Sequence, residues 1–203
     1  LQMIAIDLFK SEENGYDGYI APGGTEANIQ AIWVYRNYFM NHFKAKLEEI
    51  AIVASEDTHY SIPKAANLLM LNYLRIPVDT LTRQIETKSL QTMIQKAVKT
   101  GKKYFIIIAN MGTTMFGSVD NPDTYTHFFD EHLIPYKLHI DAAYGGFVYP
   151  FSENESFINF TNPKISSITI DAHKIMQAPY GTGIFICRKG LIENVMTKDA
   201  EYI

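Results

Sequence analysis

The sequence has 203 residues, which is the length of one ordinary α/β domain or of a large part of a bigger one. Its 47% hydrophobic and 20% charged residues are typical of a folded globular domain and exclude the disordered and collagen-like classes. Eighteen basic and 22 acidic side chains give a net charge of -4 with no run of Lys or Arg, so we expect no nucleic-acid partner and no membrane partner.

The first residues, Leu1–Lys10, predict an amphipathic helix and lack the pattern of a signal peptide. Because the sequence does not begin with Met, we expect it to be a segment of a longer protein, incomplete at both ends. No run approaches the roughly 20 consecutive apolar residues of a membrane span. Cys187 is the only cysteine, which excludes a disulfide within these residues. A single cysteine also cannot form a cysteine-based metal cage, so we expect no metal site. Few cysteines are typical of a reducing compartment, so we expect a cytoplasmic location.

Helical patterns and short apolar runs alternate along the rest of the chain. In chain order they are the helix Thr25–Lys46, the strand Ile50–Ala54, the helix Leu90–Lys99, the strand Tyr104–Ala109, the helix Pro122–Glu131 with Asn121 as its cap, and the strands Leu138–Ile140, Ile168–Ile170 and Ile184–Cys187. The strands are rich in β-branched and aromatic residues, which is typical of strands covered on both faces. This order predicts an α/β fold, with a mostly parallel sheet and crossover helices, in one domain over residues 1–203.

Ionisable or hydroxyl-bearing side chains follow four of these strands. The segments are Ser55–His59, Asn110–Thr114, Asp141–Gly146 and Asp171–Lys174. Singly, Asp or Asn after a strand is commonly a helix cap or a turn former. Four such segments in register predict instead that a lysine, two aspartates and two histidines converge at one edge of the sheet, as in an active site.

A glycine pair opens the first long helix, within Pro22–Asn28. The free amides of a helix N-terminus, approached closely through two glycines, favour an anion such as phosphate. The alternative is a tight turn with Thr25 as N-cap and Asn28 just inside the helix. The segment lacks the lysine of a P-loop and the three glycines of a dinucleotide fingerprint, which disfavours nucleoside triphosphates and NAD.

A lysine, a phosphate site and an aspartate together indicate pyridoxal phosphate as the cofactor. Its aldehyde needs an amine, which Lys174 supplies, and its pyridine nitrogen needs an acid, which Asp141 supplies. Five motifs then resemble the pyridoxal-phosphate-dependent group II amino-acid decarboxylases, which have the aspartate aminotransferase fold (fold type I): GGTEAN (23–28), SEDTHYSIPKAA (55–66), NMGTTMFGSVD (110–120), HIDAAYGG (139–146) and SITIDAHK (167–174). The five motifs occur in the same order as in the family and span nearly the whole chain. The resemblance therefore implies that residues 1–203 belong to the large cofactor-binding domain of that fold.

The resemblance implies three catalytic residues. Lys174 would form the imine with the cofactor, Asp141 would pair with the pyridine nitrogen, and His59 would stack on one face of the ring. His59 also has an alternative role as a helix-cap or surface histidine. The histidines expected to be structural are His42, His127, His132 and His139.

The resemblance also implies further cofactor-binding residues. Gly24 and Thr25 would hold the phosphate, Ala143 would pack on the second ring face, and His173 would flank the lysine. Thr114 would contact the ring hydroxyl or the substrate carboxylate.

One position departs from the pattern of the family, because Asp171 stands where many relatives have Asn, three residues before the lysine. A carboxylate beside a phosphate is repulsive, so we expect Asp171 to be turned away, protonated or bridged by a cation, and we assign it no phosphate role.

The expected reaction is decarboxylation of an L-amino acid to its amine and CO2, with an aromatic or related substrate preferred by analogy. The resemblance further implies a homodimer with its active site at the subunit interface, and a proton-donating tyrosine on a loop that begins near Lys198–Ile203. Two alternatives keep the cofactor: a carbon–carbon lyase acting on a phosphorylated amino alcohol, and an aminotransferase. A third, from another class, is a non-catalytic cofactor-binding scaffold.

Overall fold

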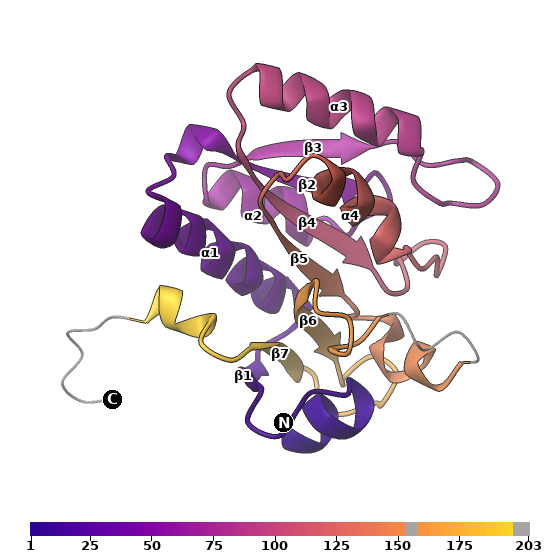
Figure 1. The fold of residues 1–203 in the computed structure, drawn as a ribbon. Coiled ribbons are helices and arrows are strands. Elements are labelled where there is room, and N and C mark those ends of the chain that lie inside the picture. Colours follow the sequence, from indigo (N-terminus) through magenta and orange to yellow (C-terminus); the bar gives the residue numbers. More distant parts are fainter. Residues whose placement is uncertain (153–157, 197–203) are drawn as a thin grey trace.

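The computed structural model describes residues 1–152 and 158–196, and within them the strands form one seven-stranded sheet (Figure 1). The order across the sheet is β1-β7-β6-β5-β4-β2-β3. The strands are β1 (Tyr16–Ala21), β2 (Ile50–Ser55), β3 (Asn72–Ile76), β4 (Tyr104–Asn110), β5 (Tyr136–Asp141), β6 (Ile165–Asp171) and β7 (Gly183–Arg188).

The five predicted strands are confirmed, each lying within β2, β4, β5, β6 or β7. The two edge strands, β1 and β3, were not predicted because they are only half buried and mix polar with apolar residues. Gly18 in β1 also weakens the strand pattern. A Cβ at this position would lie 2.2 Å from the carbonyl oxygen of Phe185, so the close pairing of β1 with β7 requires glycine there.

Four helices connect the strands: α1 (Gly24–Phe43), α2 (Ser61–Leu68), α3 (Thr87–Lys99) and α4 (Pro122–Glu131). The prediction for α4 is confirmed with its bounds, and the Asn121 side chain accepts a hydrogen bond from the Asp123 amide at 2.9 Å. The prediction for α1 runs three residues too far, because Lys44 takes a left-handed conformation (φ 55°) that ends the helix. The short helix α2 was not predicted.

The prediction of a helix over Leu1–Lys10 is wrong in extent. Residues 2–8 are helical, with Ile4–Leu8 in a π-helical turn, and the helix stops before Lys10, which takes a left-handed conformation. Ala5 and Phe9 of this segment are fully buried against the sheet.

Apolar side chains point from both faces of the sheet into two cores. Ile50 and Ile52 pack in the core that α1 and α2 cover, whereas Ala51 and Val53 pack in the core that α3 and α4 cover. The alternation of side chains along a strand places them so, and it explains why β2 is apolar throughout. No helix of residues 1–152 and 158–196 is both long and apolar enough to cross a membrane.

The sheet is mostly parallel, as predicted, and its direction brings the functional segments together. Strands β2, β4, β5 and β6 are parallel neighbours, so their carboxyl ends lie at one edge. Strand β7 is antiparallel to β6, and β1 is antiparallel to β7. The carboxyl end of β1 therefore reaches the same edge, where Gly183 pairs with Ala21 on one side and with Asp171 on the other.

Candidate active site

A cavity of about 660 Å³ lies at this edge of the sheet, and a separate cavity of about 10 Å³, which we call the narrow extension, lies beside it. The cavity is lined by six of the predicted site residues: Gly24, Thr25, His59, Ala143, His173 and Lys174. The extension is lined by the remaining two, Thr114 and Asp141, and shares His59, Ala143 and Lys174 with the cavity. All eight predicted residues, which come from five separate segments of the chain, therefore line two adjacent cavities that share three of them.

Asp171 lies beside the predicted imine-forming lysine. Its Oδ2 is 3.2 Å from Nζ of Lys174 and 3.8 Å from Nε2 of His173. The Asp171 carboxylate therefore pairs with the lysine, and how it is arranged toward a phosphate stays a prediction. The His173 ring packs against Tyr180, with 5.0 Å between ring centroids, at the exposed side of the cavity.

Asp141 ends β5 and is buried. Its Oδ2 accepts a hydrogen bond from Nδ2 of Asn28 at 2.8 Å, and its Oδ1 accepts one from the Ala143 amide at 3.1 Å. Burial raises the pKa of Asp141, while these two hydrogen bonds and the nearby Lys174 and His59 act in the opposite direction. The carboxylate is therefore held in one orientation by two donors.

His59 is half buried at the wall of the cavity. Its Nδ1 lies 2.9 Å from Oγ of Ser61 and accepts a hydrogen bond from the Ser61 amide at 3.3 Å. The N-cap of α2 is Tyr60, so His59 is not the helix cap, although its ring accepts from the amide of the first helical residue. Burial is the main cause that lowers the pKa of His59, which favours the neutral ring.

The first turn of α1 lines the cavity at the place where the sequence predicts an anion site. The helix begins at Gly24 with Gly23 as N-cap and without a side-chain cap, so the interpretation of Thr25 as N-cap is wrong. A Cβ on Gly24 would lie 2.7 Å from Oδ2 of Asp171, and a Cβ on Gly183 would lie 2.6 Å from the Gly23 backbone. These glycines permit a close approach of backbone and carboxylate, and the first amides of the helix remain open to an anion.

Two buried polar atoms at the cavity have no hydrogen-bond partner among the described residues: Oδ1 of Asp171 and Nδ1 of His173. Both residues line the cavity. Atoms of this kind are normally satisfied by a ligand or water. With the amine of Lys174, the carboxylate of Asp141 and the open end of α1, the residues present fit pyridoxal phosphate.

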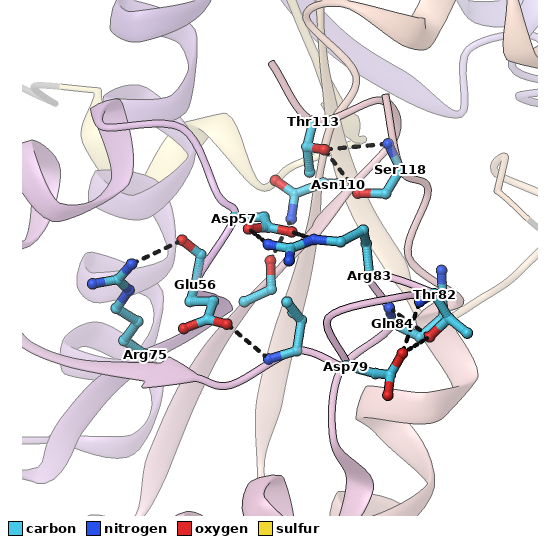
Figure 2. A network of polar contacts seen from close by, with 12 residues as sticks. Glu56, Asp57, Arg75, Asp79, Thr82, Arg83, Gln84, Asn110, Thr113 and Ser118 are labelled. Atoms are coloured by element: carbon cyan, nitrogen blue, oxygen red, sulfur yellow. Dashed lines mark hydrogen bonds and ion pairs between the residues drawn. The ribbon is translucent and has the colours of Figure 1, made fainter. Parts of the chain in front are cut away.

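A second polar network supports the loops that carry His59 and Thr114 (Figure 2). The Arg83 guanidinium binds Asp57 through two donors, with Nε at 2.9 Å, and lies over the Phe116 ring. Beside it, Nδ2 of Asn110 donates to Asp120 at 2.7 Å, and Thr58 donates to Oδ1 of Asn110 at 3.0 Å. Burial raises the pKa of Asp120 to about 6.

Several residues at the site were not predicted from the sequence. Asn28 was expected only as a helix residue and His139 only as a structural histidine, yet both belong to a buried hydrogen-bond network that reaches Asp141. The other members of that network are Tyr35, Ser61 and Ser167. A signal for them exists, since His139 and Ser167 are polar residues inside strands that are otherwise apolar, and buried polar groups need partners.

Known proteins resemble the chain in both sequence and fold. Residues 2–203 match the family model described as the pyridoxal-dependent decarboxylase conserved domain. A tryptophan decarboxylase of Clostridium sporogenes is 54% identical over 203 residues, which are 100% of this chain and 49% of that protein. A probable L-tyrosine/L-aspartate decarboxylase of Methanocella arvoryzae is 34% identical over 92% of this chain and 46% of its own length.

Solved structures share the fold at lower identity. The structure of Oryza sativa TDC with PLP and tryptamine has a TM-score of 0.84 at 20% identity, over 100% of this chain and 43% of that one. The Catharanthus roseus tryptophan decarboxylase in complex with L-tryptophan has a TM-score of 0.82 at 20% identity, over 96% and 44%. These matches confirm the predicted fold. The chain spans about half the length of the relatives that it matches, and the predicted loop near Lys198–Ile203 lies outside the described residues.

Proposed function

Because the chain belongs to the pyridoxal-dependent decarboxylase family, we propose that the protein binds pyridoxal phosphate and decarboxylates an L-amino acid to its amine and CO2. One observation carries the proposal: Lys174 and His59 line both the cavity at the N-terminus of α1 and the narrow extension that Asp141 lines. We further propose that residues 1–203 are part of the large, cofactor-binding domain of a longer protein, since the matched relatives are about twice as long.

Each residue at the site has a distinct task in this proposal. When bound, the cofactor supplies an electron sink for the pair that remains on Cα as CO2 leaves. Lys174 provides the amine that attaches the cofactor, and Asp141 holds the proton on its ring nitrogen. His59 would cover one face of the ring and Ala143, with its small side chain, would cover the other.

The remaining predicted residues complete the binding site. The amides of Gly24 and Thr25, with the hydroxyl of Thr25, hold the phosphate at the helix N-terminus. His173 flanks the lysine, and Thr114 contacts the ring hydroxyl or the substrate carboxylate from the narrow extension.

We propose an aromatic L-amino acid, with L-tryptophan first, as the substrate. The support is the 54% identity with the tryptophan decarboxylase of Clostridium sporogenes over the whole chain. The mouth of the cavity is compatible with it, because Tyr60 and Tyr180 are 61% and 93% exposed there and offer aromatic faces.

We also propose a homodimer in the cytoplasm. The dimer is supported by exposed apolar side chains at the cavity and on the segments that carry its residues: Tyr60, Met115, Phe116, Tyr144, Met176 and Tyr180. A second copy that covers them would close the open side of the cavity. Sedimentation of the full-length protein tests this, since a monomer that is fully active contradicts it. The cytoplasmic location rests on the single, buried Cys187.

The decisive experiment uses the full-length protein, pyridoxal phosphate and the standard L-amino acids. We expect an imine absorption band near about 420 nm, which the Lys174→Ala substitution removes. Lys64→Ala is the matched control, because Lys64 lines the same cavity and its loss should leave the band in place.

The products distinguish the candidate functions. Equal amounts of CO2 and amine, fastest with L-tryptophan, support the proposal. An aldehyde or a keto acid as main product would indicate the lyase or the aminotransferase instead. The absence of an imine band in the full-length protein would indicate the scaffold.

A further inference from the structure

We infer that Asn28 is a positioning residue that sets the hydrogen bonding of two cofactor-contacting side chains at once, keeping Asp141 an oriented acceptor and His59 in a single tautomer. The inference rests on the proposed function for the cofactor itself. The geometry that carries it lies entirely within the chain.

Both the nitrogen and the oxygen of the Asn28 side-chain amide have hydrogen-bond partners. Its Nδ2 donates to Oδ2 of Asp141 at 2.8 Å and to Oγ of Ser61 at 2.9 Å, while its Oδ1 lies 3.0 Å from Nε2 of His139. Asn28 is 1% exposed, and Ser61 and His139 are completely buried. No water competes for these groups, so the three contacts must satisfy one another.

The contact with His139 fixes which way the amide points. Burial lowers the pKa of His139 to about 3, so the ring is neutral and carries one proton. Nδ1 of His139 faces Oγ of Ser167 at 2.6 Å, and Nε2 faces Asn28. A proton on Nε2 gives the Oδ1 of Asn28 a donor, which leaves both N–H groups of the amide free for Asp141 and Ser61.

A chain of donors lies behind His139. The Tyr35 hydroxyl donates to Oγ of Ser167, and the Ser167 hydroxyl then donates to Nδ1 of His139. Each hydrogen bond in the series from Tyr35 to Asp141 therefore points toward the carboxylate. Series of this kind polarise their members in one direction and favour the ionised acceptor at the end.

A second branch runs from Asn28 to His59. Because Oγ of Ser61 accepts from Asn28, its own proton is available for Nδ1 of His59, 2.9 Å away. The Ser61 amide donates to the same nitrogen. Nδ1 of His59 is thus an acceptor twice over, and the proton of the neutral ring belongs on Nε2.

Through these two branches, α1 influences both Asp141 and His59, the two side chains proposed to contact the cofactor ring. Asn28 lies one turn after Gly24, whose amide is at the anion site. A single helix therefore supplies the phosphate site and, through one amide, orients the groups that face the ring nitrogen and the ring surface. A residue with a merely structural role would support the packing of α1 without affecting these protonation states.

The test compares four variants of the full-length protein. Asn28→Leu removes the amide, and Asn28→Asp keeps its shape but places an acceptor against Asp141. Ser61→Ala removes the hydroxyl from the branch to His59 and keeps the backbone amide at that position. Asn37→Leu is the matched control, because Asn37 lies on the same helix and its Nδ2 donates at 3.0 Å to the carbonyl of Asn194, outside the network.

Two measurements are made on each variant. In cofactor-free protein, ¹⁵N NMR of the histidine rings reports the tautomers of His59 and His139. With ¹⁵N-labelled pyridoxal phosphate, the shift of the ring nitrogen reports its protonation, and titration reports the affinity.

We expect the Nε2–H tautomer at both histidines in the wild type and in Asn37→Leu. Ser61→Ala should weaken the preference for this tautomer at His59 alone, because only the backbone amide of residue 61 then donates to Nδ1. Asn28→Leu and Asn28→Asp should also reduce protonation of the ring nitrogen and weaken cofactor affinity by roughly 10- to 100-fold, with Asn28→Asp the more severe.

The inference is overturned if Asn28→Asp keeps the wild-type tautomers, ring protonation and affinity, or if Asn37→Leu changes them equally. Ser61→Ala decides the His59 branch even where a substitution of Asn28 prevents folding. If the wild type does not take up the cofactor, the proposed function fails, and the tautomers in the cofactor-free protein still decide the inference.

Discussion

The buried, neutral His139 predicts a specific loss of stability in acid. In the unfolded chain this imidazole takes up a proton as the pH falls through 6.5, whereas in the folded protein burial lowers its pKa to about 3. The stability that His139 contributes is therefore complete above pH 6.5 and is lost as the pH falls toward 3. Each pH unit in this window costs about 1.4 kcal/mol, so His139 alone lowers the free energy of unfolding by about 2 kcal/mol between pH 6.5 and pH 5.

Another buried group acts in the opposite direction over part of this range. The pKa of Asp120 is raised to about 6, so its contribution to stability grows as the pH falls from 6 toward 4. The slope of the wild type alone is thus a sum of opposing effects. The informative quantity is the difference between the wild type and a variant without the His139 imidazole.

His139→Gln is the appropriate variant, because its amide can still donate to Asn28 but does not titrate. Urea unfolding of the cofactor-free, full-length protein at pH 7, 6 and 5 gives the free energies of unfolding. We expect the advantage of the wild type over His139→Gln to shrink by about 2 kcal/mol from pH 7 to pH 5. His127→Gln, at an exposed position on α4, is the control. An advantage over His139→Gln that is independent of pH would refute the reasoning.

Three further predictions concern other parts of the fold. Gly24→Ala should weaken cofactor binding and lower the free energy of unfolding by about 1–3 kcal/mol, since the added Cβ would lie 3.0 Å from that of Ala143; titration and urea unfolding measure both, and unchanged values contradict it. Arg83→Met should weaken cofactor binding while the far-UV circular dichroism stays the same, because Asp57 loses its partner near the loop of His59; wild-type affinity would contradict this. Burial raises the pKa of Cys187 to about 12, so a thiol reagent at pH 8 should label it only after unfolding; rapid labelling of the folded protein would show that the thiol is accessible.

Most of the fold could be predicted from local sequence patterns. The continuous apolar runs predicted the central strands because strands covered on both faces contain few polar residues, as β2 shows. Asn121 and Pro122 predicted the start of α4 because their chemistry is local to one turn. The edge strand β3 gave no such pattern, since it is half exposed and its identity as a strand depends on pairing with β2.

The sequence predicted the residues that line the two cavities but not the buried residues that hydrogen-bond to them. Lys174 and His59 follow a strand and Asp141 ends one, and the topology of a parallel sheet then brings them to one edge. The network behind them joins α1 to β5 and β6 through Asn28, His139 and partners far apart in sequence. No local period encodes such contacts. The same holds for Asp171, whose approach to Lys174 depends on how the chain turns after β6.

The pairing of β1 with β7 has a consequence for synthesis of the protein. During synthesis, Gly23 and the first turn of α1 leave the ribosome early. Gly183, whose backbone contacts that of Gly23, is synthesised about 160 residues later. Contacts between such distant positions form late and slowly. In the proposed function, a nascent chain that stops before β7 lacks one wall of the phosphate site, so we expect the cofactor to bind only after the sheet is complete and then to stabilise it by mass action.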